Sequence, residues 1–174
     1  MTQSIQLYTK RLDLEPLMVS HATTLFPQLR DPALYEYLDS EPPKSVAILE
    51  TQYKRWERRR SPDWSQDWLN WAARLRGGDY VGWFQATVSA NERADIAYLV
   101  FPAHQRRGYA VEACCAVIEC LRDNYPIATL RATIDPANAP SIALAQRLGM
   151  TQAGRAAHGL LFESRIHRLK AQPR

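Results

Sequence analysis

The feature that most constrains the fold lies past the middle of the chain, where a strand pattern passes through a short basic loop into a helix pattern. Residues 96–101 (IAYLVF) form a near-continuous apolar run, typical of a central strand covered on both faces. Residues 109–123 then place apolar side chains on one face of a 3.6-residue period, and residues 128–134 (ATLRATI) alternate as a strand. This order predicts a right-handed crossover, which makes the two strands parallel.

The flanking segments predict an antiparallel meander around that unit. Further strands are expected at 5–17, 69–75, 80–88 and 160–169, and further helices at 18–30, 31–39, 46–60 and 138–148. The fold class is therefore α/β (α+β): a mixed, mostly antiparallel sheet with one parallel βαβ unit and helices on both faces. With 174 residues and no linker or repeat, we expect a single domain over residues 1–174.

Composition and charge narrow the function. Apolar residues make up 46% and charged residues 23%, an ordinary globular mixture. A net charge of +4 allows an anionic ligand but is too small to indicate nucleic acid. Because no apolar run reaches spanning length and the first residues lack a signal-peptide pattern, we expect a cytoplasmic protein with no membrane partner.

The three cysteines are Cys114, Cys115 and Cys120, all within one predicted helix. Neighbours on a helix point apart, so they do not favour a disulfide, and their spacing is not that of a metal site. We expect small, mostly buried apolar residues in a reducing compartment, and no metal.

Arg106, Arg107 and Gly108 stand where the predicted helix begins. The first turn of a helix leaves N–H groups without partners, and the helix dipole favours an anion there. Gly108 has no Cβ, so the backbone could approach a phosphate closely. The two arginine side chains could contact phosphate or remain solvated, and Gly108 could simply start a helix.

Three motifs in order resemble the GNAT superfamily of acyl-CoA-dependent N-acyltransferases. QRRGYA fits its Q/R-x-x-G-x-G/A signature within ADIAYLVFPAHQRRGYAVEA; YTKRLDLEPL resembles its opening strand, and NAPSIALAQRLGM its fourth-motif helix. The pattern is most similar to the RimJ/RimL-like branch, named for ribosomal-protein N-terminal acetyltransferases. The resemblance covers nearly the whole chain and implies direct transfer from acetyl-CoA to a primary amine, without a covalent enzyme intermediate.

The resemblance also implies the residues that bind the coenzyme. It places the backbone N–H of Val100 as the oxyanion donor, with Tyr98 and Leu99 beside it along the pantetheine arm. Asn138 matches an asparagine that holds the coenzyme arm, although asparagine after Asp-Pro-Ala equally suits a turn. The pyrophosphate would lie on Arg106, Arg107, Gly108, Tyr109, Ala110 and Val111.

The resemblance points to Asp95 as the base that removes a proton from the amine, because many relatives carry an acidic residue at this position. The proton would pass through a water. Glu92, in the preceding turn, is the alternative base. Asp95 could instead pair with Arg93 or Arg131. The glutamate that the RimI-like branch carries on the next strand is Thr133 here.

Many relatives protonate the leaving thiolate with a tyrosine that acts as general acid. That position is Ala145 in this chain. Ser141 is then the best candidate to hydrogen-bond the sulfur, as in the RimL-like pattern N-x-x-S. It could instead be a helix-start residue that bonds the backbone. A thiol is acidic enough to leave with little help.

The acceptor side is the least legible. Aromatic residues around the hairpin could form a wall near the acceptor or could be core: Trp64, Trp68, Trp71 and Trp83. Acidic residues that could attract a cationic amine or be surface charges are Glu36, Asp39 and Glu41.

The function predicted is an acetyl-CoA-dependent N-acetyltransferase whose acceptor is a protein N-terminus, an amino acid, a polyamine or a small amine. One alternative is a non-catalytic acyl-CoA-binding module, which the missing tyrosine and glutamate favour. Another is a basic RNA- or ribosome-associated protein with this fold, although we do not expect a nucleic-acid partner. Both a monomer and a homodimer remain open.

Overall fold

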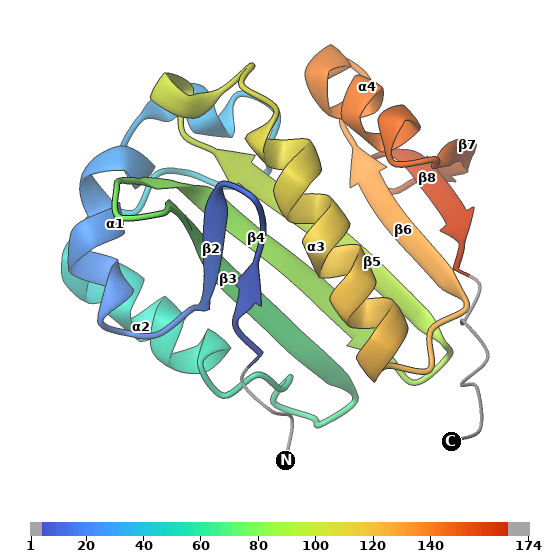
Figure 1. Cartoon of the computed structure of the whole chain (residues 1–174), viewed down its shortest axis with the longest axis horizontal. Coiled ribbons are helices and arrows are strands. Elements are labelled where there is room, and N and C mark those ends of the chain that lie inside the picture. The colour runs from blue at the N-terminus through green and yellow to red at the C-terminus, as the bar shows by residue number, and fades with distance from the viewer. Residues whose placement is uncertain (1–4, 167–174) are drawn as a thin grey trace.

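The computed structural model describes residues 5–166, and its strands form one mixed sheet (Figure 1). Within these residues the strand order is β1-β2-β3-β4-β5-β6-β8-β7, and β5–β6 is the one parallel pair. The strands span β1 Leu7–Tyr8, β2 Leu12–Pro16, β3 Gln66–Leu75, β4 Tyr80–Ser89, β5 Arg93–Val100, β6 Thr129–Ile134, β7 Thr151–Ala156 and β8 Gly159–Arg165. The mixed sheet and its single parallel unit confirm the predicted fold class.

Helices cover both faces of the sheet. They are α1 His21–Leu29, η1 Pro32–Tyr35, α2 Val46–Trp56, η2 Pro102–His104, α3 Tyr109–Asn124 and α4 Ala139–Arg147, where η is a 3₁₀ helix. The sheet has a hydrophobic core on each face, and neighbouring residues of β3 belong to different cores. Ala73 packs in the core beneath α3 and α4, whereas Ala72 packs in the core beneath α1 and α2. The alternation of a strand thus divides the interior into two layers.

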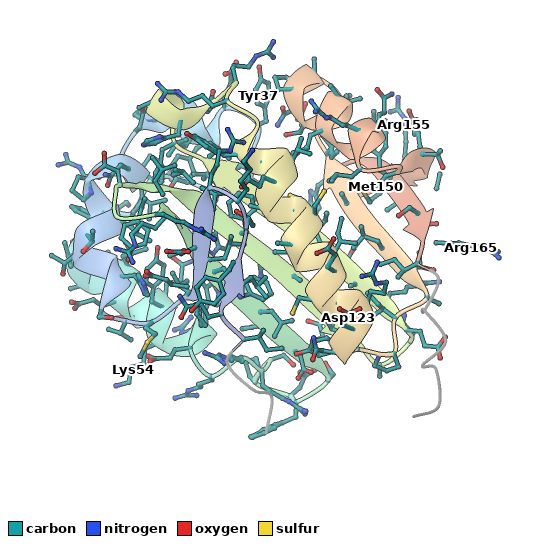
Figure 2. The ribbon with its side chains drawn as sticks, viewed as in Figure 1. Tyr37, Lys54, Asp123, Met150, Arg155 and Arg165 are labelled. Atoms are coloured by element: carbon teal, nitrogen blue, oxygen red, sulfur yellow. The ribbon has the colours of Figure 1, made fainter. Side chains whose placement is uncertain are left out.

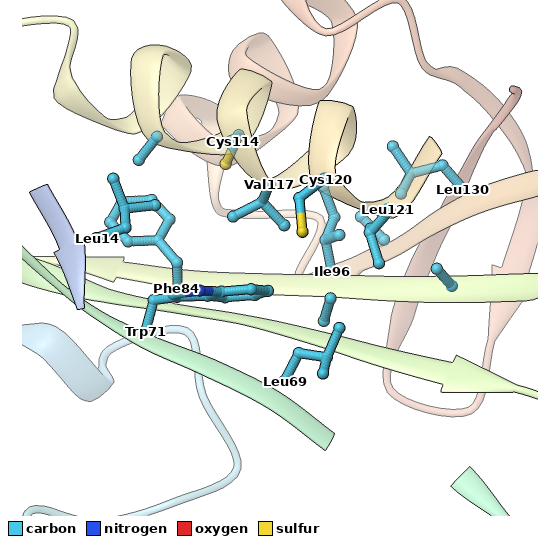
Figure 3. Packing of buried hydrophobic residues seen from close by; sticks show 14 of the residues in the cluster. Leu14, Leu69, Trp71, Phe84, Ile96, Cys114, Val117, Cys120, Leu121 and Leu130 are labelled. Carbon is cyan, nitrogen blue, oxygen red and sulfur yellow. The ribbon is translucent and has the colours of Figure 1, made fainter. Parts of the chain in front are cut away.

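The core beneath α3 uses the apolar helix face that the sequence predicts. Cys114, Val117 and Leu121 are buried and point toward strand residues such as Phe84 and Ile96 (Figure 3). Burying a side chain such as Val117 or Leu121 contributes about 1.5–3 kcal/mol. This packing fixes the N-terminal end of α3 relative to the sheet.

The first third of the chain differs from the prediction in detail. The expected strand at 5–17 is two short strands, because Thr9 turns the chain and its N–H donates to the Leu12 carbonyl at 2.9 Å. The expected helix at 31–39 is only a 3₁₀ turn, which Asp31 caps by accepting from the Ala33 N–H at 2.9 Å. Helix α2 ends at Trp56, and the chain turns at Arg59, where φ is +57°.

The last third contains a strand that the prediction missed. Strand β7 has small and polar residues and pairs with β8, so the chain ends in a hairpin. The helix expected at 138–148 is confirmed as α4, and Gly149 follows it with φ of +79°. The final predicted strand is confirmed over β8, and its positions 167–169 lie outside the described residues.

The expectation for the cysteines is partly wrong. Cys114 and Cys120 are buried, but Cys115 is exposed on the outer face of α3. All three are free thiols. Between residues 5 and 166 we find neither a helix long and apolar enough to cross a bilayer nor three or more His, Cys, Asp or Glu side chains grouped to hold a metal.

Candidate active site

The site is built where the two parallel strands part. β5 and β6 pair only over residues 93–95 and 129–131, and they diverge toward their carboxyl ends (Figure 1). The Phe101 N–H donates to the Val81 carbonyl of β4 at 2.9 Å. Because N–H groups alternate sides along a strand, those of Tyr98 and Val100 face away from β4, toward the diverging β6. The Val100 N–H therefore points into the gap between β5 and β6, and its role as oxyanion donor stays a prediction.

The loop that follows β5 has an unusual backbone. Both Arg106 and Gly108 adopt the left-handed region, with φ of +61° and +81°. The Gln105 side chain donates from Nε2 to the Val100 carbonyl at 3.0 Å and so ties the loop to the end of β5. In α3 the Glu112 N–H donates to the Gly108 carbonyl at 3.2 Å, so the N–H groups of 109–111 precede that bond and lack an intrahelical acceptor.

A polar clamp, defined by Thr9, Arg11 and Glu112, holds this loop from the other side. The Glu112 carboxylate accepts from the Thr9 hydroxyl at 2.6 Å, the Arg11 N–H at 2.8 Å and the Arg11 Nε at 2.6 Å. Arg11 also donates from Nη1 to the Arg107 carbonyl at 3.0 Å, and its guanidinium lies 4.5 Å from the Tyr109 ring centroid. The clamp thus joins the β1–β2 turn to the start of α3.

Sequence reasoning missed the clamp. Arg11 and Glu112 are 101 residues apart in the chain, and a pairing over that distance leaves no local signal. Burial alone would raise the pKa of Glu112, but hydrogen bonds from Thr9 and Arg11 outweigh it and hold that pKa below its ordinary value of 4.5. The carboxylate is therefore charged at neutral pH.

The start of α4 faces the site across the diverging strands. The turn alternative for Asn138 is realised, because its N–H donates to the Asp135 carbonyl at 2.9 Å. Its side-chain oxygen caps α4 by accepting from the Ser141 N–H at 3.1 Å. The Tyr98 hydroxyl donates to the Ser141 carbonyl at 3.5 Å and thereby links β5 to α4. Burial raises the pKa of Tyr98 to about 12, so this phenol keeps its proton at neutral pH. Ala145, at the position of the missing tyrosine, is buried.

The two candidate bases lie in different places. Asp95 Oδ1 is 3.5 Å from Arg131 Nε, so the ion-pair alternative is realised, and a role as base stays a prediction that needs a water relay. Glu92 is in the β4–β5 turn, eight residues before Val100, or roughly 26 Å along a strand. The structure therefore does not bring Glu92 to the site.

On the opposite face of the sheet, a cavity of about 570 Å³ adjoins β5. Leu99 lines it, while Tyr98 and Val100 pack toward the α3 core, so the cavity and α3 lie on opposite sides of the same strand end. The predicted aromatic wall is correct here only for Trp83. Trp71 is buried in the α3 core, and Trp64 is 72% exposed.

Trp56, which the sequence analysis did not single out, lines the cavity with Trp83. The three acidic residues also separate. Glu41 lines the cavity, Asp39 pairs with His158 at 3.2 Å, and Glu36 ends the 3₁₀ helix η1 on the surface. In the view of Figure 2, Tyr37, from the same segment, lies between the start of α3 and α4.

Comparison with known families decides what this arrangement is. The family model described as an acetyltransferase (GNAT) domain matches residues 11–151. The chain belongs to the GNAT acetyltransferase family. A comparison with curated proteins gave no match.

Solved structures of GNAT proteins share the fold. Mycobacterium smegmatis RimJ in complex with CoA-disulfide aligns with a TM-score of 0.78 at 16% identity, covering 96% of this chain and 90% of that one. RimL, described as a ribosomal L7/L12 alpha-N-protein acetyltransferase in complex with coenzyme A, gives 0.79 at 16%, covering 93% and 98%. A GNAT-family acetyltransferase from Bacillus anthracis gives 0.75 at 17%, covering 94% and 99%. These likenesses show that the chain shares the fold of those proteins, and the RimJ/RimL-like branch stays a prediction.

Proposed function

We propose that this GNAT protein is an acetyl-CoA-dependent N-acetyltransferase that transfers the acetyl group directly to a primary amine. One juxtaposition carries the proposal. The unpaired N–H of Val100 lies between two features. One is the basic segment 105–111, in which Arg106 and Gly108 have positive φ, and the other is the cavity that Leu99 lines on the opposite face of the sheet. Family membership supports the reaction class, and the coenzyme A complexes of RimL and RimJ support the cosubstrate.

The loop has the features that a pyrophosphate needs. Gly108 is exposed with φ of +81°, and an added Cβ would meet only Arg11 Nη2, at 3.4 Å, so the backbone stays open to a ligand. The N–H groups of 109–111 lie at the positive end of the helix dipole. The exposed side chains of Arg106 and Arg107 add positive charge beside them.

The reaction requires a C–N bond to form as the thioester C–S bond breaks. In the proposal the Val100 N–H donates to the carbonyl oxygen as it becomes negative. Ser141 Oγ hydrogen-bonds the departing sulfur. Asp95 lies five residues, or roughly 16 Å, before Val100 in β5, so it receives the proton of the amine along a chain of waters. Of the two protons that the ammonium loses, one ends on the thiol of coenzyme A and one in solvent.

The test is release of free coenzyme A thiol from acetyl-CoA with a panel of primary amines. Steady, amine-dependent release with intersecting double-reciprocal plots is expected for direct transfer in a ternary complex. Binding of acetyl-CoA without release for any amine would instead favour the non-catalytic acyl-CoA-binding module. A ribosomal-protein N-terminal peptide belongs in the panel because RimL, which shares the fold, is described as acting on ribosomal L7/L12.

A further inference from the structure

The cavity on the α1–α2 side has an aromatic wall. The rings of Trp56 and Trp83 stack with centroids 5.0 Å apart and planes 8° from parallel. Tyr53 stacks on Trp56 at 5.7 Å and 26°. Helix α2 supplies two of these rings and β4 the third, so the wall forms only when the helix lies on the sheet. Such a flat surface favours a second flat apolar group laid against it.

The rest of the lining is also apolar, and part of it is exposed. Leu38 and Ile48 line the cavity with 47% and 53% of their surface exposed, which makes them two of the few large hydrophobic residues left open between residues 5 and 166. Exposed apolar groups gathered at a pocket mark a binding surface more than they mark ordinary protein surface. A ligand with a large apolar body would cover them.

Charged residues and a residue next to Val100 also line the cavity. Glu41 brings a carboxylate to the cavity lining, with Lys44 also on its wall. Leu99, which directly precedes Val100 in β5, also lines the cavity. An amine held in this cavity therefore lies next to the strand end at which acyl transfer is proposed.

We propose that the acceptor is a primary amine carried by a large apolar, preferably aromatic, body that lies against the Trp56–Trp83 wall. The inference rests on the proposed function, since it specifies the acceptor of the same site. A cavity of about 570 Å³ is the size that small-molecule sites have. Ethanolamine or a polyamine would leave the apolar wall wet and is disfavoured for that reason.

The experiment compares kcat/KM for 2-phenylethylamine and tryptamine with that for ethanolamine and spermidine, using the full chain and saturating acetyl-CoA. Burial of an aryl group is expected to favour the aromatic amines by roughly 10–100-fold. Trp56→Leu should reduce that preference to a few-fold, because the leucine offers no flat surface. Trp64→Leu, which removes an exposed tryptophan outside the cavity, should leave the preference unchanged.

A second readout separates this inference from the proposed function. With coenzyme A present, 2-phenylethylamine should raise the melting temperature of the wild type and of Trp64→Leu, but not of folded Trp56→Leu. Turnover of all amines without aromatic preference would overturn the inference and keep the acetyltransferase. Absence of turnover with any amine would overturn the proposed acetyltransferase activity. The melting-temperature shift caused by 2-phenylethylamine would then decide whether the aromatic cavity binds amines.

Two sources could supply such an amine, namely a free arylalkylamine or the first residue of a peptide. A tetrapeptide that begins with phenylalanine is therefore compared with one that begins with serine. A preference for the phenylalanine peptide over both the serine peptide and 2-phenylethylamine would identify a peptide source. A preference for 2-phenylethylamine would identify a free amine, and equal rates for the two peptides and ethanolamine would contradict the inference.

Discussion

Replacing Gly82 by alanine should disturb the site without changing any residue that is proposed to contact a ligand. Gly82 lies in β4 opposite Val100, and a Cβ at this position would collide with the Leu99 carbonyl oxygen. It would also lie 3.0 Å from Val100 Cα and 3.1 Å from the Leu99 carbonyl carbon. Because these neighbours are backbone atoms, they can make room only if β5 moves away from β4.

The expected cost follows from that movement. Overpacking of a rigid site typically costs about 1–3 kcal/mol, which for a chain of this size lowers the melting temperature by roughly 3–10 °C. Misplacing a catalytic donor by a fraction of an ångström to 1 Å lowers the rate by about 10–100-fold. Since the Thr9–Arg11–Glu112 clamp holds the loop from the side away from β5, coenzyme affinity should change less than the turnover number.

The matched control is Gly154→Ala in β7, where an added Cβ meets no atom within 4 Å. Both variants are compared by urea unfolding, by kcat and by the Kd for coenzyme A. The control should stay within about 0.5 kcal/mol of the wild type with unchanged kcat. Wild-type kcat in Gly82→Ala would refute the reasoning that the Leu99–Val100 backbone positions the reaction.

Two further predictions concern the clamp and the leaving group. Glu112→Gln should cost about 1–2 kcal/mol in urea unfolding at pH 7, because the amide turns an N–H₂ toward Arg11 and loses a charge-assisted bond. Because folding lowers the pKa of Glu112 below 4.5, the clamp contributes its full stability above pH 4.5. That contribution is lost as the pH falls through the lower pKa of the folded protein, so the variant should approach wild-type stability in acid. An equal difference in unfolding free energy between variant and wild type at pH 7 and at pH 3 would contradict this. Ser141→Ala should lower kcat roughly tenfold with little change in the KM for acetyl-CoA, and an unchanged kcat would assign the sulfur contact to another group.

Much of the fold was predictable because the central unit is periodic. The apolar strand before Pro102, the helix stripe of Val117 and Leu121 and the following strand each carry their own local signal, and chirality then fixes the crossover. Strand β7 was not predictable, since its residues show no apolar alternation and it is held by pairing with β8. Its existence depends on a partner and not on its own pattern.

The site was predictable where backbone conformation defines it and not where distant side chains meet. Gly108 and the Val100 strand end follow from a motif on consecutive residues. The Arg11–Glu112 contact and the Trp56–Trp83 stack join residues that only the folded sheet brings together. The sequence offered four tryptophans near the hairpin and gave no means to choose the one that faces the cavity.

The melting temperature with and without saturating acetyl-CoA tests the central claim most directly. Ligand at a hundred times its Kd stabilises by about 2.7 kcal/mol, which corresponds here to a shift of roughly 5–10 °C. Gly108→Glu should abolish the shift, while Gly149→Glu, at an exposed glycine with a similar φ of +79°, should retain it from its own baseline. No shift in the wild type, or an equal shift in Gly108→Glu, would contradict the assignment of residues 105–111 as the coenzyme site.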